Sequence, residues 1–194
     1  LYFTLIYFTI QVSVYGVLFY LPTRIAELLG TGIGLKVGAL TSIPWIATVC
    51  MLYIVTRHAD RKGQQTRYAA LMLAMAAVGM IGSTLSGNLV LVIMAFCVAA
   101  AGFITVQPLF WTLPTRFLGG AAAASGIAVI GALGNLGGFL APTVKTWAEG
   151  YFNNPHAGMY FLAGTALLGA LMLIRSARAS GNPGKLPAPA ATPH

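Results

Sequence analysis

The sequence predicts an all-α integral membrane protein with six transmembrane helices. Of its 194 residues, 58% are hydrophobic and 7% are charged, whereas about a quarter of a soluble domain is charged. Six apolar segments approach the roughly 20 residues that a helix needs to cross a bilayer. None of them contains Lys, Arg, Asp or Glu, each of which costs about 2.5 to 3.5 kcal/mol at mid-membrane. This composition excludes a water-soluble globular protein.

The six expected spans follow one another with short polar connections. Transmembrane strands would alternate apolar and polar residues over about 10 positions, and no such alternation is present. We expect Pro22 to end the first helix, and prolines inside the second, fourth and fifth spans to bend theirs, because proline removes a backbone donor. The expected spans are residues 1–21, 37–55, 68–85, 89–113, 121–144 and 158–174.

The basic residues fix the expected orientation. One side of the membrane receives eight Lys and Arg, and the other receives three. By the positive-inside rule the richer side is cytoplasmic. We therefore expect residues 175–194 to form a disordered cytoplasmic tail that meets anionic lipid headgroups. The eight residues are Arg57, Arg61, Lys62, Arg67, Arg116, Arg175, Arg178 and Lys185.

The connection after the second span reads RHADRKGQQTR, from Arg57 to Arg67. It is interpreted either as a topology signal or as a latch that gates a transport path. In the second case Asp60 caps a helix end or pairs with a nearby Arg, while Gly63 permits a tight turn. The D-R-x-G arrangement resembles the loop motif of the major facilitator superfamily, which implies a gating role for four residues: Asp60, Arg61, Gly63 and Arg67.

Further segments resemble the second half of the anion:cation symporter family within that superfamily. They are YGVLFYLP from Tyr15, TSIPW from Thr41, QPLFWTLPTRFL from Gln107 and AAAASGIAVIGALGNLGGF from Ala121. The resemblance implies that six helices form one half of a major facilitator fold. It also implies alternating-access transport of a small organic anion (a sugar acid, hydroxy acid or aromatic acid), with protons, across a bacterial inner membrane.

Since Leu1 already lies in an apolar run, we expect this chain to begin inside a longer protein, and the resemblance implies that an amino-terminal six-helix half precedes it. The spans contain no charge, and symport generally needs a titratable group in the pathway. We therefore expect the coupling acid and the anion-binding Arg in that other half.

Candidate substrate contacts lie at i, i+4 spacing, which places both members of a pair on one helix face. These pairs are Gln11 with Tyr15, Gln107 with Trp111, and Gly131 with Asn135. Asn135 is interpreted as a substrate contact or as a hydrogen bond between helices, and Trp111 as a cavity or interfacial residue. The resemblance favours the cavity, with Gln11 replacing a common Asn and Gly131 replacing an Asn that contacts substrate.

The glycines of the fifth span have two open interpretations. Gly134 and Gly138 form a G-x-x-x-G motif that lets helices approach closely. They serve helix packing, or they let the helix slide during transport. For the whole chain, an oligomeric channel, a non-transporting scaffold and an intramembrane enzyme are the alternatives. We expect no enzyme activity, cofactor, metal site, disulfide or nucleic-acid partner.

Overall fold

The computed structural model describes residues 1–118 and 121–179. The described residues form six helices and no strand, which confirms the all-α prediction, and each helix is long and apolar enough to cross a membrane. The predicted tail beyond residue 179 lies outside the described residues, but residues 175–179 continue the last helix rather than beginning a tail. The helices are α1 (Tyr2–Leu29), α2 (Leu35–Lys62), α3 (Gln65–Thr84), α4 (Leu89–Phe117), α5 (Ala121–Tyr151) and α6 (Ala157–Ala179).

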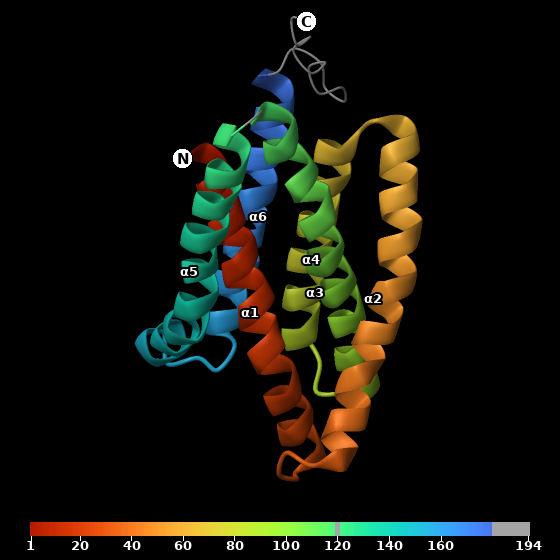
Figure 1. Ribbon diagram of the computed structural model, residues 1–194. Coiled ribbons are helices and arrows are strands. Elements are labelled where there is room, and N and C mark those ends of the chain that lie inside the picture. The colour runs from red at the N-terminus through yellow and green to blue at the C-terminus, as the bar shows by residue number, and fades with distance from the viewer. Residues whose placement is uncertain (119–120, 180–194) are drawn as a thin grey trace, which may run out of the picture.

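The helices form two groups of three that lie side by side (Figure 1). In one group α1 packs against α5 and α6, and in the other α4 packs against α2 and α3. Contacts of α3 with α6 and of α1 with α4 join the groups. Successive helices run in opposite directions, so the N-terminus, the α2–α3 connection and the C-terminal end of α6 share one end of the bundle.

We call this end the basic end (Figure 1), because the last turns of α2, the first turn of α3 and the last turns of α6 carry Lys and Arg residues there. They are Arg57, Arg61, Lys62, Arg67, Arg175 and Arg178.

Glycine residues let α3 and α4 approach each other closely. A Cβ atom on Gly102 would lie 2.5 Å from the backbone oxygen of Met72 and 2.7 Å from the backbone nitrogen of Ala76. Gly79 approaches the α4 backbone equally closely. Beside this contact, large side chains such as Phe96 and Phe103 are fully buried. Small residues thus let the two helix backbones approach closely. In a bilayer this close packing drives helix association, because the lipid tails are as apolar as the side chains.

The prediction that Pro22 ends the first helix is wrong. Helix α1 continues past Pro22 to Leu29 and ends at Gly30, whose φ of 61° is left-handed. Proline costs the helix one hydrogen bond, and the hydroxyl of Thr23 donates to the Tyr20 carbonyl at 2.7 Å nearby. The added turns bury Ile25 completely, so packing against the bundle outweighs the local loss.

Two helices leave broad apolar faces open. Only 17% of the apolar window of α2 and 28% of that of α5 is buried, against 72% for α1. Exposed side chains on α2 include Ile46, Val49 and Ile54. Faces of this kind are stable beside lipid or other transmembrane helices rather than in water, as expected for an integral membrane protein.

Candidate functional site

Helix α1 presents a polar and aromatic stripe to its neighbours. Tyr7, Gln11 and Tyr15 stand one turn apart, at i, i+4 and i+8. Gln11 is only 3% exposed, and its Nε2 donates a hydrogen bond to Oδ1 of Asn135 on α5 at 2.5 Å. The structure therefore brings together two predicted site residues that are 124 positions apart in the sequence.

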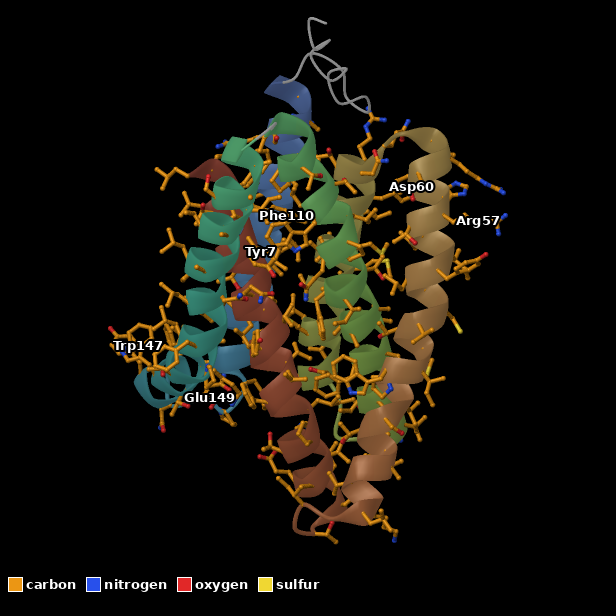
Figure 2. The ribbon with its side chains drawn as sticks, viewed as in Figure 1. Tyr7, Arg57, Asp60, Phe110, Trp147 and Glu149 are labelled. Carbon is orange, nitrogen blue, oxygen red and sulfur yellow. The ribbon has the colours of Figure 1, made fainter. Side chains whose placement is uncertain are left out.

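The second predicted pair, Gln107 and Trp111 of α4, meets this stripe through Tyr7. The Tyr7 hydroxyl donates to Oε1 of Gln107 at 3.5 Å, a long hydrogen bond. Its ring stacks on Phe110 with centroids 5.2 Å apart and meets Trp111 edge-on at 4.8 Å. Figure 2 shows Tyr7 and Phe110 together between α1 and α4.

Trp111 thus contacts the stripe instead of standing apart from it. Tyr7 was not among the predicted site residues, although its position one turn before Gln11 was the available signal.

The glycines of α5 receive these aromatic rings. A Cβ atom on Gly134 would overlap the ring of Tyr7, and one on Gly138 would overlap the ring of Tyr15. The G-x-x-x-G motif therefore packs against α1 side chains. Gly131 differs, because a Cβ there would meet only Trp111, at an ordinary 3.8 Å. We call Tyr7, Gln11, Tyr15, Gln107, Trp111 and Asn135 the amide–aromatic cluster.

The hydrogen bonds within the cluster use the side-chain oxygens of Asn135 and Gln107 but not their NH₂ groups. Gln11 occupies the side-chain oxygen of Asn135, and Tyr7 occupies that of Gln107. Among the described residues, no hydrogen bond uses the amide NH₂ group of either acceptor residue. Asn135 is exposed and Gln107 is half-buried, so both NH₂ groups are available to a ligand. In Gln11 the NH₂ group donates to Asn135, and Oε1 is buried without a partner within the described residues.

The predicted gating segment lies at the basic end (Figure 2). Gly63 ends α2 with a left-handed φ of 62°, which provides the tight turn. Oδ1 of Asp60 accepts a hydrogen bond from Nε2 of Gln65 at 3.2 Å. In the described part of the chain Asp60 forms no ion pair, and Arg61 and Arg67 are exposed. The contact across the turn is therefore an Asp–amide hydrogen bond, and Gln65 was not among the predicted gating residues.

The ion pairs of the described residues lie at the other end. Lys145 contacts Glu149 at 2.7 Å and Arg24 contacts Glu27 at 3.2 Å. Nζ of Lys145 also lies 4.6 Å from the ring centroid of Tyr20. Within residues 1–118 and 121–179, no three His, Cys, Asp or Glu side chains lie close enough to hold a metal ion.

The described residues thus form six helices of transmembrane length, with an uncharged polar and aromatic cluster on α1, α4 and α5. Residues 1–142 match the family profile of the Major Facilitator Superfamily, so the chain belongs to this superfamily of transporters. The chain is therefore an integral, multi-pass membrane protein that belongs to a family of transporters and not to a family of enzymes.

Several transport proteins are similar in sequence. The "Inner membrane transport protein RhmT" of Escherichia coli (strain K12) is 46% identical over 171 residues, 87% of this chain and 39% of that protein. The "Quinolone resistance transporter" of Acinetobacter baumannii is 36% identical over 87% of this chain and 38% of its own length. A "Putative tartrate transporter" of Agrobacterium vitis is 33% identical over 94% of this chain and 42% of its own length. The chain thus spans about two-fifths of these relatives.

Proposed function

We propose that this chain is the carboxy-terminal six-helix half of a carrier of the anion:cation symporter family. It transports a small organic anion, such as a hydroxy acid, sugar acid or aromatic acid, by alternating access. The observation that carries the proposal is the pair of unoccupied NH₂ groups on Asn135 and Gln107, held by Gln11 and Tyr7. Carboxylate and hydroxyl oxygens accept hydrogen bonds from such donors.

The chemistry of the cluster suits a polar anion with a flat or extended body. Tyr15 adds a hydroxyl group, and Trp111 adds an indole face. Neutral donors orient a carboxylate without binding it as tightly as a buried ion pair would.

In this proposal the amino-terminal half supplies the charged groups that bind the anion and couple its transport to protons. The six predicted spans contain no Lys, Arg, Asp or Glu, whereas proton coupling requires a titratable group in the pathway. The two halves rock about a central site, with the amide–aromatic cluster on the wall that this half contributes. The name of the tartrate relative supports a hydroxy acid as substrate.

The orientation follows from the basic end, which carries most of the Lys and Arg residues and faces the cytoplasm of a bacterial inner membrane. The turn that contains Asp60, Arg61, Gly63 and Arg67 then lies on the cytoplasmic side. The hydrogen bond between Asp60 and Gln65 links the end of α2 to the start of α3. In the proposed cycle this link holds the two helices together while the halves rock.

Uptake by the full-length protein in proteoliposomes tests the proposal. Labelled tartrate, sugar acids and aromatic acids are supplied with and without a proton gradient, and a quinolone serves as the comparison substrate. We expect saturable uptake of at least one acid that a proton gradient increases. If no acid is taken up, or if only the quinolone is transported, the proposal is wrong.

Two matched variants test the donor role of Asn135. Asn135→Asp replaces the NH₂ donor with an acceptor and places a charge beside an anionic substrate. Asn154→Asp makes the same change at a loop residue whose Oδ1 accepts the His156 backbone N–H at 2.9 Å. We expect the KM to rise about tenfold or more only for Asn135→Asp, since hydrogen bonds to charged groups contribute about 1.5 to 3 kcal/mol. Equal KM values for the two variants would refute the donor role.

A further inference from the structure

A groove runs between α3 and α6, away from the amide–aromatic cluster. Its volume is about 460 Å³, and α3 and α6 supply all ten residues that line it. Both helices lie behind α1 and α4 in the view of Figure 1. None of the groove residues belongs to the cluster, so substrate binding does not explain the groove.

The groove is apolar along its length. Eight of the ten lining residues are Ala, Leu or Ile. Ala70 and Ala170 are each 4% exposed and form its floor, whereas Leu71 and Leu171 are more than half exposed and form its walls. The small Ala residues on the floor and the larger Leu residues on the sides shape a groove into which a hydrocarbon chain fits.

Its length matches one leaflet of a bilayer. The lining residues of α6 extend from Leu167 to Arg178 at helical spacing, a rise of roughly 16 Å at about 1.5 Å per residue. The hydrocarbon core is about 30 Å thick, so the groove covers about half of it. It begins at the basic end and stops near mid-membrane, as one acyl chain of a lipid does.

Two arginines stand together at the basic end of the groove. Arg67 of α3 and Arg178 of α6 both line it and both are exposed. Within the described residues neither forms an ion pair, since both salt bridges lie at the opposite end. The one acidic residue at the basic end, Asp60, bonds to Gln65. Arg67 also lies in the first turn of its helix, where a cation opposes the helix dipole, so helix stability does not account for it.

We propose that the α3–α6 groove binds one anionic phospholipid from the leaflet at the basic end. The phosphate contacts Arg67 and Arg178, and an acyl chain fills the groove between Leu71 and Leu171. Basic pockets between transmembrane helices on the cytoplasmic side recognise anionic headgroups in this way. The site needs only the membrane orientation from the proposed function and is independent of the transported substrate.

Native mass spectrometry of the full-length detergent-solubilised protein tests the site. Phosphatidylglycerol and phosphatidylcholine with identical acyl chains are titrated separately. We expect one phosphatidylglycerol to bind preferentially. Each basic residue near an anionic headgroup contributes about 1 kcal/mol, so replacing both Arg67 and Arg178 with Gln should weaken phosphatidylglycerol binding by about 30-fold. Arg178→Gln alone should weaken it by about fivefold.

A matched control separates a site from general surface charge. Arg175→Gln removes the same charge from the same end of α6, but Arg175 does not line the groove. It should leave phosphatidylglycerol binding within about twofold of the unmodified protein. Equal losses for Arg175→Gln and Arg178→Gln would overturn the proposal, because charge alone would then explain the binding.

A second variant tests the groove itself. Ala74→Leu fills the groove from its half-buried α3 side without changing charge, and should weaken binding of both phospholipids. Free glycerol phosphate should not compete, since the headgroup alone cannot fill the apolar part. Competition by glycerol phosphate, or unchanged binding in Ala74→Leu, would show that no acyl chain is held there. Elution volume and melting temperature confirm that each variant is folded.

Discussion

Replacing Gln11 with Leu separates the two interpretations of the Gln11–Asn135 pair. If the pair mainly holds helices together, its loss lowers stability. If it orients Asn135 for substrate, its loss raises the KM of transport. Gln11 is buried, and Leu has a similar size, so the substitution removes the polar atoms without leaving a large cavity.

The stability change is expected to be small. The variant loses the hydrogen bond to Asn135, which contributes about 0.5 to 1.5 kcal/mol in proteins and about 0.6 kcal/mol on average between membrane helices. It also removes Oε1 of Gln11, which is buried without a partner in the described structure and costs about 1 to 3 kcal/mol. The two effects offset each other, so the melting temperature should stay constant or rise slightly.

Transport should change more than stability. Without Gln11 the oxygen of Asn135 has no donor, and the side chain no longer presents its NH₂ group in one orientation. A loss of about 1 kcal/mol in substrate affinity corresponds to a KM about fivefold higher.

The assays are proteoliposome uptake and thermal melting of the detergent-purified full-length protein, for Gln11→Leu, Asn135→Leu and the double variant. The KM effects of the single variants should not add, since both act through one contact. A melting temperature several degrees lower with an unchanged KM would refute this reasoning and assign the pair to helix packing.

The glycines provide two further predictions, each with a matched control. Gly102→Ala forces α3 and α4 apart, because its Cβ would lie 2.5 Å from a backbone oxygen. Thermal melting should show a loss of about 1 to 3 kcal/mol, whereas Gly164→Ala, with no atom within 4 Å, should be neutral or stabilising by up to about 1 kcal/mol. Equal melting temperatures would contradict the close contact. Gly134→Ala displaces the Tyr7 ring and should raise the KM of uptake. Gly131→Ala should retain transport, because its Cβ would lie 3.8 Å from Trp111, an ordinary contact distance. A higher KM for Gly131→Ala than for Gly134→Ala would disprove the assigned ring contacts.

Local sequence patterns predicted much of this fold. Six uncharged apolar segments of transmembrane length predicted six helices, and the described residues form six. The spacing of Gln11 and Tyr15 predicted a shared face, and both lie in the stripe on α1. The D-R-x-G motif predicted a tight turn, and Gly63 has the left-handed conformation. Each of these features depends on residues within a single helix or the turn that follows it.

The structure also changed what those patterns had indicated. Pro22 was expected to end α1, but burial of Ile25 against the bundle carries the helix onward. Asp60 was expected to cap a helix or pair with an arginine, and it bonds to the Gln65 side chain instead. At Pro22 a contact with other helices outweighs the preference of the local sequence, whereas at Asp60 a side chain five residues further on forms the hydrogen bond.

The sequence by itself determined that this protein has helices, that they belong in a membrane, and which residues share a helix face. Only the tertiary structure decided that Gln11 meets Asn135, that Tyr7 meets Gln107, and that Gly134 and Gly138 receive tyrosine rings. The physical reason is that helical periodicity is set by hydrogen bonds four residues apart. Contacts between helices depend instead on how whole helices cross and on where small residues let their backbones approach.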